Sequence, residues 1–167
     1  MAPDTCNIAL FGCGTVGTGV ACMLLGRRGS VQERFGDCLQ LSHIVDQRTE
    51  HVREEVAPPN SVRITDDVQG VLNNDDVDVI VELFGGVEVA GSIVEQALRA
   101  GKHVVTANKA LLADRGDHLF RVARECGRSI AYEASAAGCI PIVSALREDF
   151  AADRVRSLYG IVNGTCN

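Results

Sequence analysis

The first apolar run of the chain leads into a glycine-rich turn and then into a helical pattern. Residues 7–11 read Asn-Ile-Ala-Leu-Phe, and residues 12–17 read Gly-Cys-Gly-Thr-Val-Gly. Beyond this turn, apolar residues recur at helical spacing and form one face, made by Val16, Val20 and Leu24. The pattern predicts a β-strand, a tight turn and an α-helix at the start of the fold.

Further short apolar runs, rich in β-branched residues, predict the other strands. They lie at residues 39–45, 62–65, 77–83, 103–106 and 129–133, with a last strand expected at 155–162. The run at 77–83 is nearly continuous in Val and Ile, which is typical of a central parallel strand covered on both faces.

Helical patterns lie between most of these runs. We expect a short helix capped by Asp66, a helix at 90–100 that ends before Gly101, a helix around 119–126, and another that begins at Pro141. Residues 50–55 resemble a charged surface loop. Strands that alternate with helices predict an α/β fold, a Rossmann-type doubly wound parallel sheet in three α/β/α layers.

The glycines of the first turn predict dinucleotide binding. Gly12 permits the tight turn, Gly14 lets the backbone approach a pyrophosphate, and Gly17 lets the helix pack closely on the strand. The unpaired N–H groups of the first helical turn would face the phosphates. The alternative is a glycine-rich turn that holds no ligand.

The end of the second predicted strand bears on which dinucleotide is bound. Asp46 stands where a carboxylate accepts hydrogen bonds from the adenosine ribose, which favours NAD. Arg48, and more distantly Arg53, favour NADP, because a guanidinium can pair with its 2′-phosphate. A charged surface loop without a ligand is the other interpretation, so NAD and NADP both remain open.

Two further turns are predicted at the same edge of the sheet. Gly85 and Gly86 follow the strand at 77–83, and Asn108 and Lys109 follow the strand at 103–106. Because the carboxyl ends of parallel strands line the ligand crevice, we expect Lys109 to lie there with a functional role. The alternative is a solvated lysine at the start of a helix.

The segment after the strand at 129–133 consists of small residues before Pro141. Its exposed carbonyl oxygens, together with the carboxylate of Glu133, would suit a monovalent or divalent cation. A tight strand-to-helix turn without a metal explains the same residues.

Composition excludes several classes of partner. The 167 residues carry 16 Lys and Arg against 22 Asp and Glu, a formal net charge of −6, so we expect binding neither to nucleic acid nor to an anionic membrane. No apolar run reaches spanning length and the amino terminus lacks signal-peptide features, so we expect a cytoplasmic protein. The 7 cysteines are scattered, which favours reduced structural thiols over a zinc site.

Four sequence blocks together resemble the homoserine dehydrogenase family. They are Gly-Cys-Gly-Thr-Val-Gly at 12–17, Val-Val-Thr-Ala-Asn-Lys-Ala-Leu-Leu-Ala at 104–113, Glu-Ala-Ser-Ala-Ala-Gly-Cys-Ile-Pro-Ile at 133–142 and Gly-Ile-Val-Asn-Gly-Thr-Cys-Asn at 160–167. The resemblance covers essentially the whole chain, in the family's order. It implies an NAD(P)-dependent oxidoreductase that interconverts L-homoserine and L-aspartate 4-semialdehyde in threonine, methionine and isoleucine biosynthesis.

The resemblance also implies roles for individual residues. The backbone of Thr15 and Val16 would meet the pyrophosphate, and Lys109 would lie beside nicotinamide and substrate as a binding or proton-transfer residue. The family's sodium site would correspond to Glu133 with the carbonyls of Ala136, Gly138 and Ile140. The chain departs from the usual family residues at Ala136 and Cys139 of that loop, and at Asp46, where an arginine or polar residue is common.

The resemblance further implies that residues 1–150 form the NAD(P)-binding domain and that 151–167 begin the connection into a substrate and dimerisation domain. That second domain supplies the family's main acid–base lysine and substrate-binding carboxylates. We therefore expect the 167 residues alone to bind cofactor but to turn over poorly or not at all, and to form a homodimer only with that domain. A stand-alone, non-catalytic nucleotide-binding or regulatory module is the alternative.

Overall fold

A six-stranded, all-parallel sheet forms the centre of the molecule in the computed structural model, which describes residues 5–26, 35–138 and 140–160. The strand order is β3-β2-β1-β4-β5-β6, the doubly wound order of the predicted Rossmann-type fold. The strands are β1 (Cys6–Phe11), β2 (Leu39–Val45), β3 (Arg63–Thr65), β4 (Val79–Glu82), β5 (His103–Thr106) and β6 (Ile130–Ala131).

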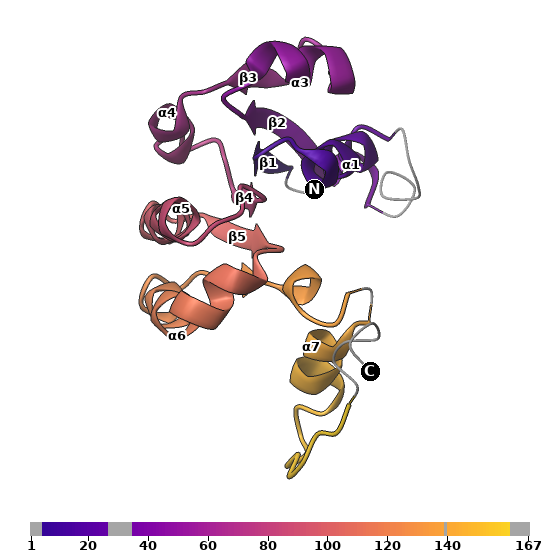
Figure 1. Cartoon of the computed structure of the whole chain (residues 1–167), viewed down its shortest axis with the longest axis vertical. Coiled ribbons are helices and arrows are strands. Elements are labelled where there is room, and N and C mark those ends of the chain that lie inside the picture. Colours follow the sequence, from indigo (N-terminus) through magenta and orange to yellow (C-terminus); the bar gives the residue numbers. More distant parts are fainter. Residues whose placement is uncertain (1–4, 27–34, 139, 161–167) are drawn as a thin grey trace.

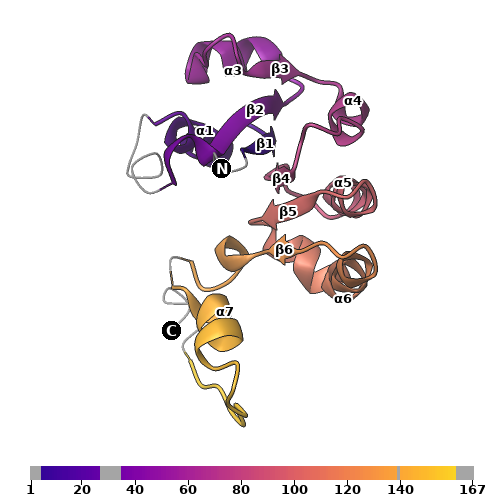
Figure 2. The same ribbon diagram turned by 180° about the vertical axis from the view of Figure 1, so that it is seen from behind.

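Helices cover both faces of this sheet. The helical elements of the described residues are α1 (Thr15–Leu24), η1 (Gly36–Cys38), α3 (Thr49–Val56), α4 (Val68–Leu72), α5 (Glu88–Arg99), α6 (Lys109–Glu125), η2 (Glu133–Ser135), α7 (Ile142–Ser144) and η3 (Ala145–Asp149). Figure 1 shows α4, α5 and α6 along one side and α1 on the other, and Figure 2 shows the same layers from behind. In the described part of the chain, no helix combines the length and hydropathy that a membrane crossing requires.

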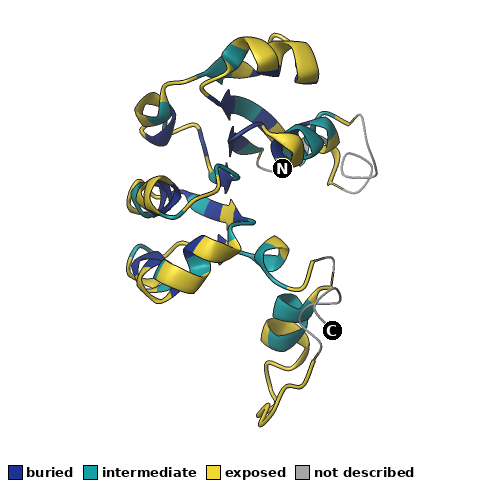
Figure 3. Ribbon diagram, in the orientation of Figure 1, coloured by how far each residue is buried: buried dark blue, intermediate teal, exposed yellow. Residues whose placement is uncertain are grey.

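The alternation of side chains along β1 supplies both layers of the core. Ala9 and Phe11 belong to the cluster packed under α5 and α6, whereas Ile8 and Leu10 belong to the cluster packed under α1 and α3. Burial is therefore concentrated on the central strands, as Figure 3 shows. A strand covered on both faces explains why its sequence is a continuous apolar run.

One helix was not expected from the sequence. Residues 50–55, interpreted above as a charged loop, lie within α3. Only Val52 and Val56 of this helix are buried, at 1% and 0% exposure, because they are four residues apart and face the sheet together. The other positions are mostly charged, so the apolar stripe was too narrow to recognise.

Two boundaries and the exposure of one side chain also differ from expectation. The cap of α4 is Asp67, whose carboxylate accepts a hydrogen bond from the Gly70 amide at 2.9 Å, rather than Asp66. Helix α6 starts at Lys109 rather than near residue 119, because the Asn108 side chain caps it by accepting from the Leu111 amide at 3.0 Å. Val16, expected on the apolar face of α1, is 61% exposed.

The strand expected at 155–162 is wrong for its described residues, 155–160. Residues 155–160 have no regular secondary structure, and residues 161 and 162 lie outside the described residues. Every residue from 151 to 160 is exposed, including Tyr159 at 91%. Within the part of the chain that the structure describes, residues 155–160 therefore pair with no strand.

Candidate cofactor site

The glycine turn is fixed to the neighbouring strands by backbone geometry. The Gly12 amide donates to the Val45 carbonyl at 2.9 Å, and Gly12 has a φ of +93°. A Cβ at Gly12 would lie 2.8 Å from the Leu83 carbonyl oxygen, and one at Gly17 would lie 2.1 Å from the Gly12 carbonyl oxygen. Both positions require glycine because the backbone leaves no space for a side chain.

Gly14 differs from the other two glycines because nothing lies within 4 Å of the position of its Cβ. It precedes α1, whose first backbone bond runs from the Thr18 amide to the Gly14 carbonyl at 2.8 Å. Thr15 and Val16 are exposed in the first turn, so their amides precede the hydrogen-bonded ladder of the helix. This arrangement is suited to an anionic group approaching the helix N-terminus.

A hollow of about 510 Å³ opens beside this turn, at the carboxyl ends of β1, β2 and β4. Its polar residues come from the glycine turn and from the ends of β2 and β3. Its apolar wall comes from the β4 tip and from α4 and α5. The lining residues are Gly12, Cys13, Gly14, Val45, Asp46, Gln47, Arg48, Asp66, Val68, Leu83, Phe84, Gly85, Val89 and Ile93. A mixed lining of this kind fits a ligand with one polar and one aromatic part.

Asp46 holds the glycine turn in place. It is only 7% exposed, and its carboxylate accepts from the Cys13 amide at 2.8 Å and from the Arg48 amide at 2.9 Å. Burial alone would raise the pKa of Asp46, but the two amides and the Arg48 guanidinium outweigh it and hold the pKa below its ordinary value of 3.8. The residue expected to contact a ribose therefore also stabilises the loop.

Replacing this carboxylate tests the stabilising role. The Asp46→Asn variant is expected to lose about 1–3 kcal/mol of the free energy of unfolding at neutral pH. Because the folded-state pKa lies below the unfolded value, the contribution of Asp46 is complete above the unfolded pKa and disappears as pH falls through the folded one. Urea unfolding of both proteins, from neutral pH to well below 3.8, measures the difference.

Asp66→Asn is the matched control, because Asp66 is an exposed carboxyl one strand away, at the end of β3. It should change the free energy of unfolding by less than about 0.5 kcal/mol at every pH. A difference between Asp46→Asn and the unaltered chain that stays constant down to the lowest pH would contradict the role given to Asp46.

Of the two arginines considered for a 2′-phosphate, only Arg48 lines the hollow. Its side chain is 62% exposed, and its Nε lies 3.5 Å from Oδ1 of Asp46. Arg53 lies on α3, where its Nε is 3.6 Å from the Glu50 carboxylate. The geometry therefore favours Arg48 over Arg53 as a ligand for an anion in this hollow.

The turns after β4 and β5 meet at the same edge of the sheet. Gly85 lines the hollow and has a φ of +74°, and the Asn108 side-chain amide donates to the Gly86 carbonyl at 2.6 Å. Lys109 is the exposed first residue of α6, and it does not line the hollow. The expected meeting of these turns is present, while the ammonium group of Lys109 lies beyond the enclosed part of the site.

The carboxylate of Glu133 is already engaged with the chain. Its two oxygens accept from the Val143 and Ser144 amides, each at 3.0 Å, so it caps the helical segment that begins with α7. The Ile140 carbonyl accepts from the Ile142 amide at 2.8 Å. Of the predicted ligand carbonyls, those of Ala136 and Gly138 lie in a turn where Gly138 has a φ of +63°. Cys139 lies outside the described residues.

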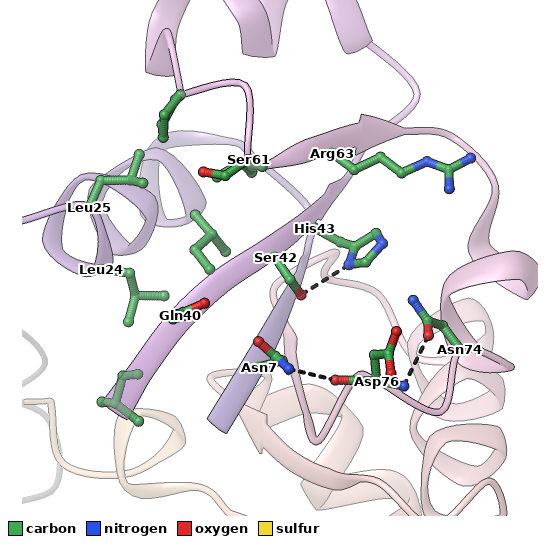
Figure 4. Close-up of a pocket in the computed structure, with 14 residues that line it drawn as sticks. Asn7, Leu24, Leu25, Gln40, Ser42, His43, Ser61, Arg63, Asn74 and Asp76 are labelled. Atoms are coloured by element: carbon green, nitrogen blue, oxygen red, sulfur yellow. Dashed lines mark hydrogen bonds between the residues drawn. The ribbon is translucent and has the colours of Figure 1, made fainter. Parts of the chain in front are cut away.

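A second hollow of about 810 Å³ lies at the opposite ends of the strands. Figure 4 shows its polar side, where the Asn7 side chain bonds to Asp76 and Ser42 lies 3.0 Å from the His43 ring. Leu24 and Leu25 of the α1 end form its apolar side. Because ligands of parallel sheets bind outside the carboxyl ends of strands, the smaller hollow is the stronger candidate.

Sequence reasoning did not identify the apolar wall of the smaller hollow. Val68 and Ile93 were expected in helices, yet nothing in their spacing distinguished a residue that also borders a cavity. Glu82, a fully buried acid at the end of β4, was likewise not recognised. The sequence does contain a signal for Glu82, because it is the one acidic residue of β4, a strand that ends at the crevice.

Comparison with known proteins agrees with this geometry. A family model described as "Homoserine dehydrogenase, NAD binding domain" matches residues 12–133. The chain is 42% identical over 161 residues to a homoserine dehydrogenase of Neisseria gonorrhoeae, covering 96% of this chain and 36% of that protein. It is 41% identical to one of Bacillus subtilis, covering 96% of this chain and 37% of that protein.

Solved structures give the same result. A homoserine dehydrogenase from Thiobacillus denitrificans superposes with a TM-score of 0.77 at 33% identity, over 90% of this chain and 34% of that one. A homoserine dehydrogenase of S. aureus gives a TM-score of 0.66 at 36% identity, over 81% and 33%. The chain thus spans about a third of the length of the relatives it matches.

Proposed function

This chain belongs to the homoserine dehydrogenase family through its NAD-binding domain, and on that premise we propose that it is the cofactor-binding part of an NAD(P)-dependent homoserine dehydrogenase. The observation that carries the proposal is the hollow beside the glycine turn, with open space at Gly14 and the first turn of α1 facing outward. A dinucleotide pyrophosphate fits this position because helix N-terminal amides bind phosphate oxygens.

The two halves of the dinucleotide would occupy different sides of the glycine turn. The adenosine half would lie toward the end of β2, near Asp46 and Arg48, with Val68, Val89 and Ile93 available to contact the adenine ring. The nicotinamide half would then lie toward Phe84, Gly85 and the tips of β4 and β5. This assignment uses both the polar and the apolar parts of the lining.

The proposed reaction is the interconversion of L-homoserine and L-aspartate 4-semialdehyde. A bound NAD(P) would supply the hydride acceptor or donor. Lys109 would act as the proton partner or binding residue for the substrate oxygen, because α6 begins beside the Asn108–Gly86 contact at the crevice. The remaining substrate contacts, and a homodimer interface, would come from a further domain of the kind that relatives of greater length contain.

We propose that the cofactor domain comprises residues 1–150 and that 151–167 begin a connection. The uniform exposure of residues 151–160, without regular secondary structure, supports this boundary. A cytoplasmic location remains part of the proposal, as does the alternative of a non-catalytic nucleotide-binding module. Both functions require the glycine turn, so cofactor binding alone does not separate them.

A sodium ion bound by Glu133 and the carbonyls of Ala136, Gly138 and Ile140 is a further part of the proposal. Its support is the sequence resemblance together with the position of Glu133 beside the turn at Gly138. The amide contacts of Glu133 use one lone pair on each oxygen, so each oxygen keeps further acceptor capacity. The ion would help hold the loop against the end of β5.

Titration of the purified chain with NADH and NADPH by calorimetry tests the cofactor proposal. We expect the chain to bind both nucleotides. The Arg48→Ala variant should weaken NADPH binding about tenfold and change NADH binding by less than about twofold, because only NADPH carries a 2′-phosphate.

The same titrations in sodium and in potassium buffers test the proposed sodium ion. We expect tighter nucleotide binding in sodium.

Arg53→Ala is the matched control, since Arg53 is equally charged but lies on α3 away from the lining of the hollow. It should leave both affinities unchanged. Failure of the unaltered chain to bind either nucleotide would overturn the proposed cofactor site, and equal losses for NADH and NADPH in Arg48→Ala would remove its role in selecting the 2′-phosphate.

A further inference from the structure

Glu82 is a buried carboxylate at the edge of the crevice. It is the last residue of β4 and has 0% exposure. No lysine or arginine of the described residues forms an ion pair with it. Its Oε1 accepts from the Phe84 amide at 2.9 Å, and its Oε2 accepts from the Thr106 hydroxyl at 2.6 Å. Moving a carboxyl group out of water costs free energy, so the burial of Glu82 needs a physical explanation.

Thr106 links Glu82 to the turn that follows β5. It ends β5 with 1% exposure, and while its hydroxyl donates to Glu82, its oxygen accepts from the Asn108 amide at 3.0 Å. The Thr106 carbonyl also accepts from the Ser135 hydroxyl at 2.9 Å. One residue thus joins the ends of β4 and β5 to the start of α6 and to η2.

Asn108 completes the connection across the crevice edge. Its side-chain nitrogen donates to the Gly86 carbonyl at 2.6 Å, and its side-chain oxygen caps α6 through the Leu111 amide at 3.0 Å. Lys109 is the residue that follows. The hydrogen bonds therefore run from Glu82 to the Gly85–Gly86 turn and to the helix that begins with Lys109.

The hydrogen bonds of Glu82 give this network a direction. Both of its side-chain oxygens act as acceptors, and the Thr106 hydroxyl donates to Oε2. The lone pairs of that hydroxyl are then left for the Asn108 amide. A group that could also donate would allow the hydroxyl to turn, and Asn108 would lose a fixed partner.

We propose that Glu82 is a positioning residue, which acts through Thr106 and Asn108 to fix the Gly85–Gly86 turn as the wall of the crevice that receives the nicotinamide half of the dinucleotide, together with the start of α6 at Lys109. The inference rests on the proposed function, because it assumes that a dinucleotide lies across the glycine turn. It assigns Glu82 and Thr106 to one half of the ligand only. The adenosine half lies at the end of β2, which this network does not reach.

The test compares NADH with ADP-ribose, which lacks the nicotinamide. In the Thr106→Val variant the hydroxyl is lost at almost constant volume, and calorimetry should show NADH binding weakened about tenfold with ADP-ribose binding within about twofold. Thr106→Ser keeps the hydroxyl and should restore NADH binding. Glu82→Gln, which introduces a donor opposite that hydroxyl, should resemble Thr106→Val.

Ser42→Ala is the matched control, because the Ser42 hydroxyl joins β2 to the Ile8 carbonyl at 3.1 Å, at the end of the sheet away from the crevice. It should leave both affinities unchanged. Urea unfolding verifies that each variant is folded at the titration temperature.

Four results would overturn the inference. Equal weakening of NADH and ADP-ribose by Thr106→Val would reduce the network to general stability, and unchanged NADH binding would remove its role. NADH binding no tighter than ADP-ribose binding in the unaltered chain would show that this wall receives no nicotinamide. Absence of binding of either ligand by the unaltered chain would overturn the proposed function, and this inference with it.

Discussion

Replacing Gly17 with alanine is expected to abolish cofactor binding and to destabilise the fold. The new Cβ would lie 2.1 Å from the Gly12 carbonyl oxygen and 3.0 Å from the Gly12 carbonyl carbon. Both are backbone atoms, so neither can move aside as the end of a flexible side chain could. The turn and α1 would have to separate, at a cost of roughly 1–3 kcal/mol or more in the free energy of unfolding. Displacing the helix N-terminus should weaken NADH binding at least about 100-fold.

Two other glycines of this segment serve as matched controls. Gly14→Ala adds a Cβ into open space at an ordinary φ of −81°, so stability should change by less than about 0.5 kcal/mol, but NADH binding should fall because the Cβ occupies the expected position of the pyrophosphate. Gly19→Ala also meets nothing within 4 Å and lies inside α1, so binding should be unchanged and stability should rise by about 0.5–1 kcal/mol.

Urea unfolding and calorimetry of the three variants separate the two kinds of glycine. A folded Gly17→Ala variant that binds NADH normally would contradict the close packing of the turn on α1. Normal binding by Gly14→Ala would contradict the position given to the pyrophosphate.

Truncation of Phe11 is expected to give the largest loss of stability in the core. Phe11 is fully buried at the end of β1, and its ring meets the Phe84 ring edge-on with centroids 6.0 Å apart. Phe11→Ala should lower the free energy of unfolding by about 3–5 kcal/mol, because it leaves a cavity between the sheet and α5. The loss is a large part of the roughly 5–15 kcal/mol that stabilises a domain of this kind.

Urea denaturation monitored by far-UV circular dichroism measures this loss. Phe150→Ala is the same substitution at a residue that is 48% exposed, and it should cost less than about 1 kcal/mol. Equal effects of the two substitutions would be incompatible with a core centred on β1. Because Phe84 lines the hollow, any Phe11→Ala protein that remains folded should also bind NADH more weakly.

Most of the fold could be predicted because its local signals agree with its buried surfaces. The apolar runs at 39–45 and 103–106 correspond to strands β2 and β5 at the same residues. These strands lie inside the sheet, where Leu41, Ile44, Val45 and Val104 are buried. Gly101 marks the end of α5 and has a φ of +79°, a conformation that favours glycine, so the signal was backbone chemistry rather than packing.

The errors have a physical basis as well. Helix α3 contributes only Val52 and Val56 to the core, so its period was hidden by charged neighbours. The apolar residues of 155–160 satisfied a strand pattern, but a strand also needs a partner, and a pattern contains no information about whether one is present. Side-chain caps such as Asn108 depend on the geometry of a turn rather than on periodicity.

The candidate site was predictable to a similar extent. The roles expected of Gly12, Gly14 and Gly17 depend on backbone space, which the spacing of the glycines already implies. The second contact of Asp46, to the Cys13 amide, could not be inferred because it joins residues 33 positions apart. The predicted roles of Lys109 and of Glu133 stay predictions.

The backbone bonds around the glycine turn continue the sheet beyond the ends of its strands. The Gly12 amide bonds to Val45, the Asp46 amide to Thr65 at 3.1 Å, and the Leu83 amide to Phe11 at 2.8 Å, so the turns that line the hollow share the ladder of β1 to β4. These turns have therefore already lost their conformational entropy when the domain folds. A ligand that enters the hollow does not have to order them, and more of its contact energy remains available as affinity.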